Sequence, residues 1–316
     1  MAEPLIKTVG LKKYFKTSRG LLHAVDNVNF TIEKGKTLGV VGESGCGKTT
    51  LGRTILRLTE PTDGQIFFNG KDITKVTGKE MHDFRRNAQI IFQDPSSSLN
   101  PRMSVGQLIA EPIRVMKTIS GAKAIDEKVY KLMETVGLDE RFYVSYPHEL
   151  DGGRRQRIGV ARALAVDPQF IVCDEPVSAL DVSIQAQILN LLMDLQDSMG
   201  LTYMFITHDL SVVKHISTDI AVMYLGQCIE KAPTDELFEH PLHPYTQALL
   251  QAIPIPNLKN RSIESTIKGE ISSPINPKPG CRFATRCPYV KPECTGTELE
   301  LKEVSPNHFV KCVLCN

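Results

Sequence analysis

The chain has 316 residues, enough for one large domain with an appendage or for two modest domains. Hydrophobic residues make up 41% of it and charged residues 23%, which is ordinary for a globular protein. The 37 Lys and Arg residues nearly balance the 36 Asp and Glu residues, so the net charge of +1 argues against nucleic acid as a partner. We find neither a secretory signal nor the apolar run of about 18 residues that a membrane-spanning helix needs, so we expect any link to a membrane to go through a partner.

The first part of the chain predicts short strands followed by a helix. Residues 5–34 alternate apolar and polar side chains in short runs, which is typical of antiparallel strands. Residues 37–41 predict a short buried strand, and a helical pattern starts after Lys48. Residues 59–73 then predict a turn followed by a hairpin strand.

The middle of the chain predicts a mostly helical segment from residue 94 to about 165, opened by a loop. Residues 170–173 and 201–206 are apolar strands, separated by helical spacing over 183–199. Strands that alternate with helices imply an α/β fold with a largely parallel sheet. Proline becomes frequent after about residue 233, where we place a domain boundary, and residues 252–280 are linker-like.

A glycine-rich loop joins the strand at 37–41 to the helix behind it. Backbone N–H groups in such a loop face a phosphate, and the helix N-terminus adds its positive end. We expect Lys48 to bridge the β- and γ-phosphates of a nucleotide and the Thr49 hydroxyl to hold Mg²⁺. The alternative is a chance glycine turn, which the strand–loop–helix context disfavours. The loop fits the pattern G-x-x-x-x-G-K-[ST] with Gly42, Glu43, Ser44, Gly45, Cys46, Gly47, Lys48 and Thr49, followed by Thr50.

Polar side chains lie at the ends of predicted strands, where a nucleotide would react. Asp174 and Glu175 end the apolar strand at 170–173, so Asp174 is expected near the metal and Glu175 as the residue that polarises the attacking water. Gln93 could touch Mg²⁺ or that water through its amide, and His208 could donate to the γ-phosphate. Each of these residues, taken alone, is more often a solvated loop or strand-end group.

Six ordered motifs resemble those of the ATP-binding cassette (ABC) family of transporter ATPases. They are the phosphate loop, Gln93, LDGGRRQR, FIVCDEP, SALD and ITHD, and the resemblance covers about residues 4–233. It implies a P-loop NTPase fold with a RecA-like core, an antiparallel β subdomain and an inserted helical subdomain at about 94–165. It also implies a head-to-tail dimer that sandwiches ATP, with Tyr14 stacked on adenine; a core role for that ring is the alternative.

The signature motif, expected to face the partner's ATP, contains Asp151, Gly152, Gly153 and Arg154. Serine is usual in the family where Asp151 stands, and glutamine where Arg155 stands. Aspartate is a good helix N-cap, worth about 1 kcal/mol over alanine, so the helix behind it should still form. A carboxylate about 4 Å from a phosphate charge costs roughly 4 kcal/mol at an effective dielectric constant of about 20. We therefore expect an asymmetric dimer in which the ATP that faces Asp151 binds or turns over poorly.

Other segments resemble the ATPases of oligopeptide/dipeptide importers and of their nickel-importing relatives. They are IFQDPSSSLNPRMSVGQLIAEPI, HPLHPYTQALLQAIP and GEISSPINPKPGCRFATRCPYVKPEC. The resemblance implies a peripheral ATP hydrolase at the cytoplasmic face of the membrane, with its C-terminal extension at 234–316. The implied partners are a second ATPase subunit, two membrane permeases and an extracytoplasmic substrate-binding protein. Nickel import and a soluble, non-transport ABC ATPase are the alternatives.

Eight cysteines are present, and five of them lie in the last 36 residues. Cys281, Cys287, Cys294 and Cys312 lack the tight C-x2-4-C pairs that are usual in structural zinc sites. Iron–sulfur clusters take four thiolates at more varied spacing. Relatives in the importer subfamily hold a [4Fe–4S] cluster at such cysteines, so the resemblance implies one here. Reduced free thiols in a small packed domain are the alternative, and Cys315 could replace Cys312.

Overall fold

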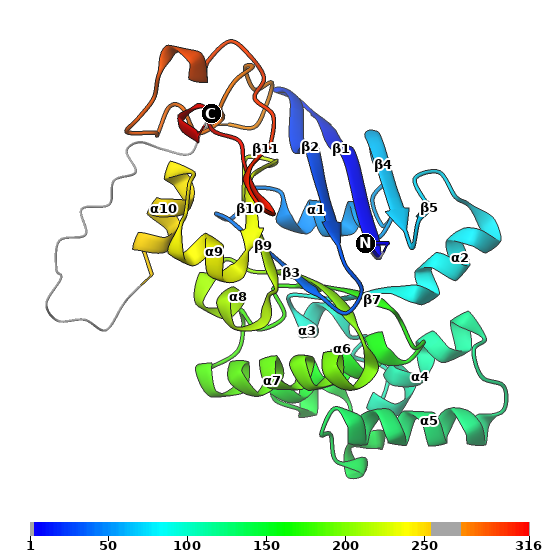
Figure 1. The fold of residues 1–316 in the computed structure, drawn as a ribbon. Helices are drawn as coiled ribbons and strands as arrows, with labels where there is room; N and C mark the ends of the chain where they lie inside the picture. The colour runs from blue at the N-terminus through cyan, green and yellow to red at the C-terminus, as the bar shows by residue number, and fades with distance from the viewer. Residues whose placement is uncertain (1–2, 254–272, 316) are drawn as a thin grey trace, which may run out of the picture. The chain divides into compact units, whose positions relative to one another are not determined.

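The structure is a computed structural model that describes residues 3–253 and 273–315. It contains two compact units (Figure 1). The helical unit comprises Met1–Leu5, Glu33–Lys36 and Phe68–Met204, and the β-rich unit comprises Ile6–Ile32, Thr37–Phe67 and Phe205–Asn316. Most of the linker expected at 252–280 lies outside the described residues.

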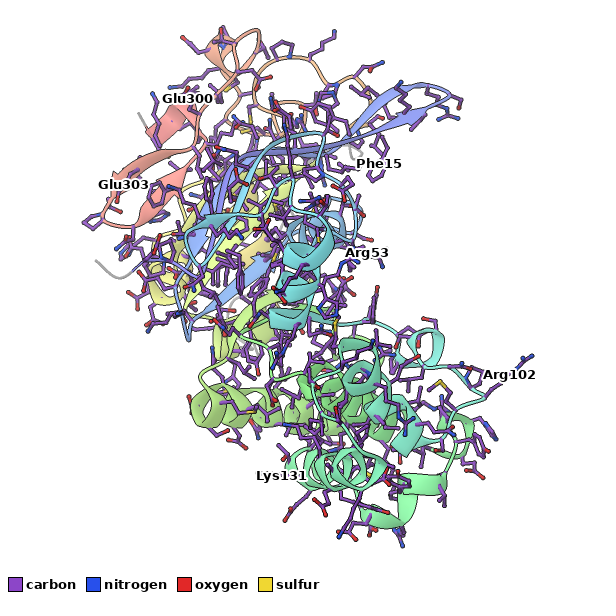
Figure 2. The ribbon with its side chains drawn as sticks, turned by 90° about the vertical axis from the view of Figure 1, so that its right-hand side faces the viewer. Phe15, Arg53, Arg102, Lys131, Glu300 and Glu303 are labelled. Atoms are coloured by element: carbon purple, nitrogen blue, oxygen red, sulfur yellow. The ribbon has the colours of Figure 1, made fainter. Side chains whose placement is uncertain are left out.

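The helical unit contains most of the helices. Helix α4 buries Val105, Leu108, Ile109 and Ile113, an apolar stripe at helical spacing, and packs against α5 and α6. The exposed loop before it carries Arg102, which projects from the surface (Figure 2). The helices are α2 (Gly78–Asn87), α3 (Pro95–Ser98), α4 (Val105–Met116), α5 (Ala122–Thr135), α6 (Gly152–Leu164) and α7 (Val182–Met199), with 3₁₀ turns η1 (Glu140–Val144) and η2 (Pro147–Glu149).

The strands of the helical unit include the predicted apolar ones. β6 and β7 run parallel with Ala88 opposite Phe170, as the alternating strand and helix pattern predicts. All five residues of β7 and of β8 are buried. The strands are β5 (Lys71–Asp72), β6 (Ala88–Ile91), β7 (Phe170–Asp174) and β8 (Thr202–Ile206), the last of which continues into the β-rich unit, and their order includes β8-β7-β6.

The β-rich unit contains two sheet portions. The antiparallel pair predicted over residues 5–34 is present as β1 (Ile6–Thr17) and β2 (Gly20–Ile32), and β4 (Asp63–Phe68) lies beside β1. A second portion has the order β11-β12-β10-β9-β3 and pairs β3 and β9 in parallel. Its strands are β3 (Thr37–Val41), β9 (Asp219–Tyr224), β10 (Gln227–Pro233), β11 (Lys302–Ser305) and β12 (His308–Val310).

The C-terminal part of the chain joins this second portion. β10 ends at Pro233 and α9 begins at Thr234, where the composition changes. β12 nevertheless pairs with β10, with Glu230 opposite Val310, so the extension adds strands to the sheet. The division of domains at residue 233 stays a prediction. The helices of this unit are α1 (Lys48–Ile55), α8 (Leu210–Ile216), α9 (Thr234–Glu239) and α10 (Pro244–Gln251), with η3 (Pro292–Cys294) and η4 (Val313–Cys315).

Candidate nucleotide-binding site

The glycine-rich loop connects β3 to α1 in the β-rich unit, in the strand–loop–helix context that the motif requires. Glycine is needed at two of its positions for steric reasons. Gly42 and Gly47 have φ angles of +149° and +104°, and a Cβ would lie 2.2 Å from the Met223 carbonyl oxygen and 2.0 Å from that of Ala24, respectively. Larger residues would therefore push the loop away from the strands behind it.

Lys48 begins α1 and is only 5% exposed. Its ammonium donates hydrogen bonds to the carbonyl oxygens of Gly42 (2.7 Å) and Glu43 (3.1 Å), within the loop itself. No side chain caps the N-terminus of α1, because the N-cap residue is Gly47. The backbone N–H groups at this end are thus not satisfied by a side-chain cap, which suits a phosphate group.

A second group of predicted residues lies in the helical unit. The Gln93 amide nitrogen donates a hydrogen bond to the Glu175 carboxylate (2.9 Å), so the structure brings these two residues together. Asp174 ends β7 and is 2% exposed. Glu175 follows it with a φ of +46°, a left-handed conformation that costs a residue with a Cβ about 1–2 kcal/mol. Strain of this kind is concentrated at functional sites.

The expected Mg²⁺ ligands are divided between the two units. Thr49 belongs to the β-rich unit, and Gln93 and Asp174 belong to the helical unit, so their joint role stays a prediction. His208 lies in the β-rich unit, exposed, just beyond β8. Asp181, of the SALD motif, caps α7 by accepting the Ile184 N–H at 3.0 Å.

Tyr14 is half-buried and held in place by its neighbours. Its ring stacks on His23, with centroids 4.0 Å apart and planes 20° apart, so one face of the ring is already covered. Its hydroxyl donates to Asp26, which also pairs with Arg282. Burial alone would raise the pKa of Asp26, but the hydrogen bond from Tyr14 and the Arg282 charge bring that pKa below its usual value. The adenine-stacking role of Tyr14 stays a prediction.

Three residues of the C-terminal part contact either the phosphate loop or Asp26, and the sequence analysis predicts none of these contacts. Arg286 forms a two-point ion pair with Glu43 of the phosphate loop, at 2.9 Å and 3.1 Å. The Tyr245 hydroxyl accepts the Glu43 N–H at 2.9 Å, and Arg282 pairs with Asp26. The only sequence signal for the arginines is that each directly neighbours a cysteine, Cys281 or Cys287.

The signature residues lie at the start of α6. As expected, Asp151 is the N-cap, and its carboxylate accepts the Arg154 N–H at 2.8 Å. The same carboxylate also pairs with the Arg154 guanidinium at 2.7 Å, which partly offsets the negative charge. A Cβ on Gly153 would lie 2.7 Å from the Ile184 side chain, so that glycine lets α6 and α7 approach each other.

The four cysteines predicted as cluster ligands line one small pocket. Cys281, Cys287, Cys294 and Cys312 share it with His243 and Tyr289, and the Cys281 N–H donates to the Cys294 carbonyl at 2.8 Å. Burial raises the pKa of Cys281 to about 11 and that of Cys312 to about 12. Within residues 3–253 and 273–315, however, no three Cys, His, Asp or Glu side chains are grouped as a metal site requires. The donor set fits an iron–sulfur cluster by its chemistry, but its present arrangement does not form a closed ligand shell.

Similarity to known proteins decides the family. The family model "ABC transporter" matches residues 25–178, and "Oligopeptide/dipeptide transporter, C-terminal region" matches residues 229–294. The chain is 49% identical to the oligopeptide transport ATP-binding protein AppF of Bacillus subtilis, over 99% of this chain and 98% of that protein. This chain is an ATP-binding subunit of the ABC transporter family.

Other relatives of this ABC subunit support the same family assignment. It is 48% identical to the dipeptide transport ATP-binding protein DppF of Haemophilus influenzae, over 98% of this chain and 96% of that protein. Among solved structures, it resembles the dimeric ATP-binding cassette MJ0796 bound to ADP and Pi, with a TM-score of 0.66, 27% identity, and coverage of 72% of this chain and 98% of that one. The cassette cbiO1 of Clostridium perfringens gives a TM-score of 0.67 at 27% identity, over 76% of this chain and 92% of that one. These findings confirm the predicted ABC ATPase fold and the prediction that the chain is an ATP hydrolase. In the part of the ABC subunit that the structure describes, no helix is both long and apolar enough to cross a bilayer.

Proposed function

We propose that the chain hydrolyses ATP to drive a membrane importer of oligopeptides or dipeptides. The observation that carries this proposal is similarity along the whole chain, C-terminal region included, to proteins named for oligopeptide and dipeptide transport. Those names support peptides over nickel and over a soluble, non-transport ATPase. The chain would use a RecA-like core, an antiparallel β subdomain and an inserted helical subdomain, and its Cys-rich extension would follow the cassette.

The nucleotide would bind at the glycine-rich loop. Lys48 now donates to two loop carbonyls, and it would exchange them for the β- and γ-phosphates while the uncapped end of α1 receives phosphate oxygens. Thr49, Gln93 and Asp174 offer the hard oxygen ligands that Mg²⁺ prefers. When bound there, Mg²⁺ would neutralise the charge that develops on the phosphates.

Glu175 would act as the general base of hydrolysis. It would take a proton from the attacking water as the new oxygen–phosphorus bond forms and the bond from the γ-phosphorus to the bridging oxygen of ADP breaks. Gln93 already holds the Glu175 carboxylate by a hydrogen bond of 2.9 Å, which fixes its orientation. His208 would donate to the γ-phosphate.

A second ATPase subunit would complete the nucleotide sites, and the dimer would be asymmetric. Asp151 would face the ATP held by the partner's loop and repel its γ-phosphate. Its ion pair with Arg154 lowers this repulsion, because the two side chains together carry no net charge. Replacing Asp151 by serine in the assembled complex should raise ATPase and transport rates several-fold. Unchanged rates would show that the repulsion is irrelevant.

Two permeases and an extracytoplasmic substrate-binding protein would be the other partners, and the chain would lie at the cytoplasmic face of the membrane. The segment after Gln93, in which residues 100–102 are exposed, would receive a permease helix. The test is to purify the chain with its natural companions and measure ATPase activity with added peptides or nickel salts. Stimulation by nickel and not by peptides would overturn the proposed cargo.

The cysteine pocket is proposed to hold a [4Fe–4S] cluster through Cys281, Cys287, Cys294 and Cys312. Support comes from the four sulfur ligands that line one pocket, although they must move closer to share a cluster. Protein purified without oxygen should contain iron and sulfide, and Cys287→Ser should lose most of the iron. The matched control is Cys228→Ser, a change outside this pocket. Stoichiometric zinc, or no metal, would overturn the assignment.

A further inference from the structure

A cavity of about 530 Å³ lies in the β-rich unit, and no residue of the phosphate loop lines it. Its walls come from β1, β2, β10, β12 and the segment just before β11. Strands of the cassette and residues of the C-terminal extension therefore both line it. Glu300, in that segment, is labelled in Figure 2. The residues of its wall include Lys7, Asn29, Lys231, Glu300, Phe309 and Lys311.

Two lysines in this wall are buried. Lys231 is 9% exposed and Lys311 is 5% exposed. Neither ammonium group forms a hydrogen bond or an ion pair with any residue that the structure describes. The Lys231 ammonium lies 5.8 Å from the centre of the Phe309 ring, which is a weak cation–π contact. Lysine is almost never this buried unless its charge is paired.

The balance of charge in the cavity is positive. Lys7 adds a third ammonium from an exposed position on β1, and Glu300 is the one carboxylate among the residues of the cavity wall. Desolvation lowers the pKa of Lys311, and the nearby Arg282 acts in the same direction, against the opposing charges of Glu298 and Asp26. Buried cations that form no ion pair destabilise a fold. A site that keeps such charges around an open volume is arranged for an anion.

We propose that this cavity binds a small organic anion that carries phosphate or carboxylate groups. Lys231 and Lys311 pair with the anionic group, and Lys7 closes over it from the rim. The amide of Asn29 lines the same wall, and Phe309 offers an apolar surface to the rest of the ligand. Because Lys231 belongs to β10 and Lys311 directly follows β12, the bound anion links the cassette to its extension and stabilises their pairing.

The test uses the full chain carrying Lys48→Ala, which removes phosphate binding by the nucleotide loop. Thermal unfolding and calorimetry are measured with pyrophosphate as the phosphate probe and citrate as the carboxylate probe, and both are repeated with the parental Lys48 chain. At least one probe should bind and raise the unfolding midpoint, and the better probe identifies the chemical class. Failure of both probes to bind would overturn the proposal.

Lys311→Met and Lys231→Met then locate the site. Each should weaken probe binding at least tenfold, whereas Lys278→Met, at an exposed lysine outside the cavity, should leave it unchanged. Without any anion, Lys311→Met should unfold at the same or a higher temperature, because it removes an unpaired buried charge and keeps the side-chain length. If Lys311 has only a structural role, Lys311→Met should instead unfold at a lower temperature than the parent. A variant that unfolds earlier and still binds the probe would overturn the assignment.

Discussion

The guanidinium of Arg286 holds both carboxylate oxygens of Glu43, the second residue of the phosphate loop, at 2.9 Å and 3.1 Å. Arg286 directly precedes Cys287, so the cysteine-rich segment touches the nucleotide loop. The Glu43 carboxylate would otherwise place a free negative charge beside a phosphate site. The arginine therefore both positions the loop and neutralises that charge.

Arg286→Met should weaken ATP binding about tenfold, or about 1.4 kcal/mol, because the freed Glu43 repels the phosphates. Adding Glu43→Gln should restore most of the affinity, since the repelling charge is then gone. The measurement is a fluorescent ATP titration on the four combinations of the two residues, with Arg19→Met, an exposed change, as the control. Simple loss of structure would instead make the double variant at least as weak as Arg286→Met alone.

A comparison of Glu175→Gly with Glu175→Ala should separate the effect of residue 175 on stability from its effect on ATPase activity. The residue has a φ of +46°, which glycine adopts without strain, so Glu175→Gly should be about 1 kcal/mol more stable than Glu175→Ala. Both variants should lose at least about 100-fold in ATPase rate, because the proposed general base is absent. Urea unfolding and phosphate release give the two quantities. Equal stabilities would show that the left-handed backbone is relaxed in this protein.

Asp151→Ala should destabilise the chain by about 1 kcal/mol, since α6 loses its N-cap. Asp151→Ser should cost only a few tenths, because a hydroxyl caps a helix nearly as well. The serine variant is thus the matched control for capping, and denaturant unfolding at fixed pH is the measurement. If the two variants were equally unstable, the Arg154 ion pair rather than the cap would be the source of the stability.

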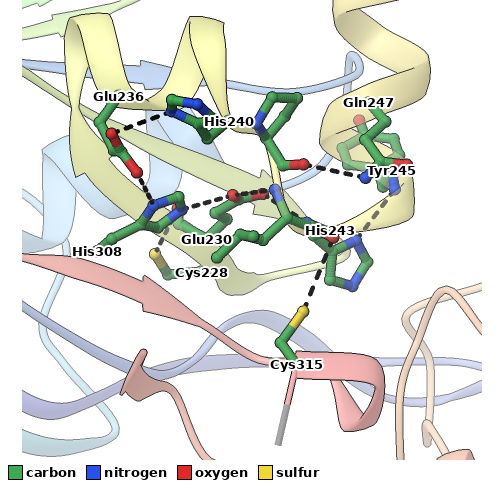
Figure 3. A network of polar contacts seen from close by, with 11 residues as sticks. Cys228, Glu230, Glu236, His240, His243, Tyr245, Gln247, His308 and Cys315 are labelled. Atoms are coloured by element: carbon green, nitrogen blue, oxygen red, sulfur yellow. Dashed lines mark hydrogen bonds and ion pairs between the residues drawn. The ribbon is translucent and has the colours of Figure 1, made fainter. Parts of the chain in front are cut away.

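The pH dependence of unfolding should show the pairing of His308 with Glu230. His308 is fully buried, and its ring nitrogens lie 2.8 Å from Glu230 and 3.4 Å from Glu236 (Figure 3). Burial alone would lower the pKa of His308, but the hydrogen bonds and charges of the two glutamates outweigh it and raise that pKa above 6.5. Folding thus favours the protonated ring.

His308→Gln should therefore lose about 3 kcal/mol in the free energy of unfolding at pH values below about 6.5. The difference from the parent should shrink as the pH rises through the raised pKa, where the folded chain gives up the proton. Nearby His243 has its pKa lowered to about 4 by burial, but it is present in both chains and cancels in the comparison. The exposed His215→Gln is the control, and a difference that stays constant with pH would contradict the pairing.

Local pattern predicted much of the fold. The strand at 37–41, the glycine loop and the helix from Lys48 follow from neighbouring residues, and all three are present. The sequence analysis does not predict helix α2, because its sequence, GKEMHDFRRN, contributes only two buried apolar residues, Met81 and Phe84. The segment at 94–165 is mostly helical, as its pattern predicts, and contains α3 to α6 with the turns η1 and η2.

The sequence by itself determined the phosphate loop, the acids Asp174 and Glu175 at the end of β7, and the family, because each motif depends on a few residues close together in the chain. Only the tertiary structure decided that Arg286 reaches Glu43, that four cysteines line one pocket, and that Lys231 and Lys311 share a cavity. These residues come from segments far apart in the chain, and β-sheet pairing and burial bring those segments together. Local spacing carries no signal for such contacts, since the free energy that brings them together comes from surfaces that only the folded chain buries.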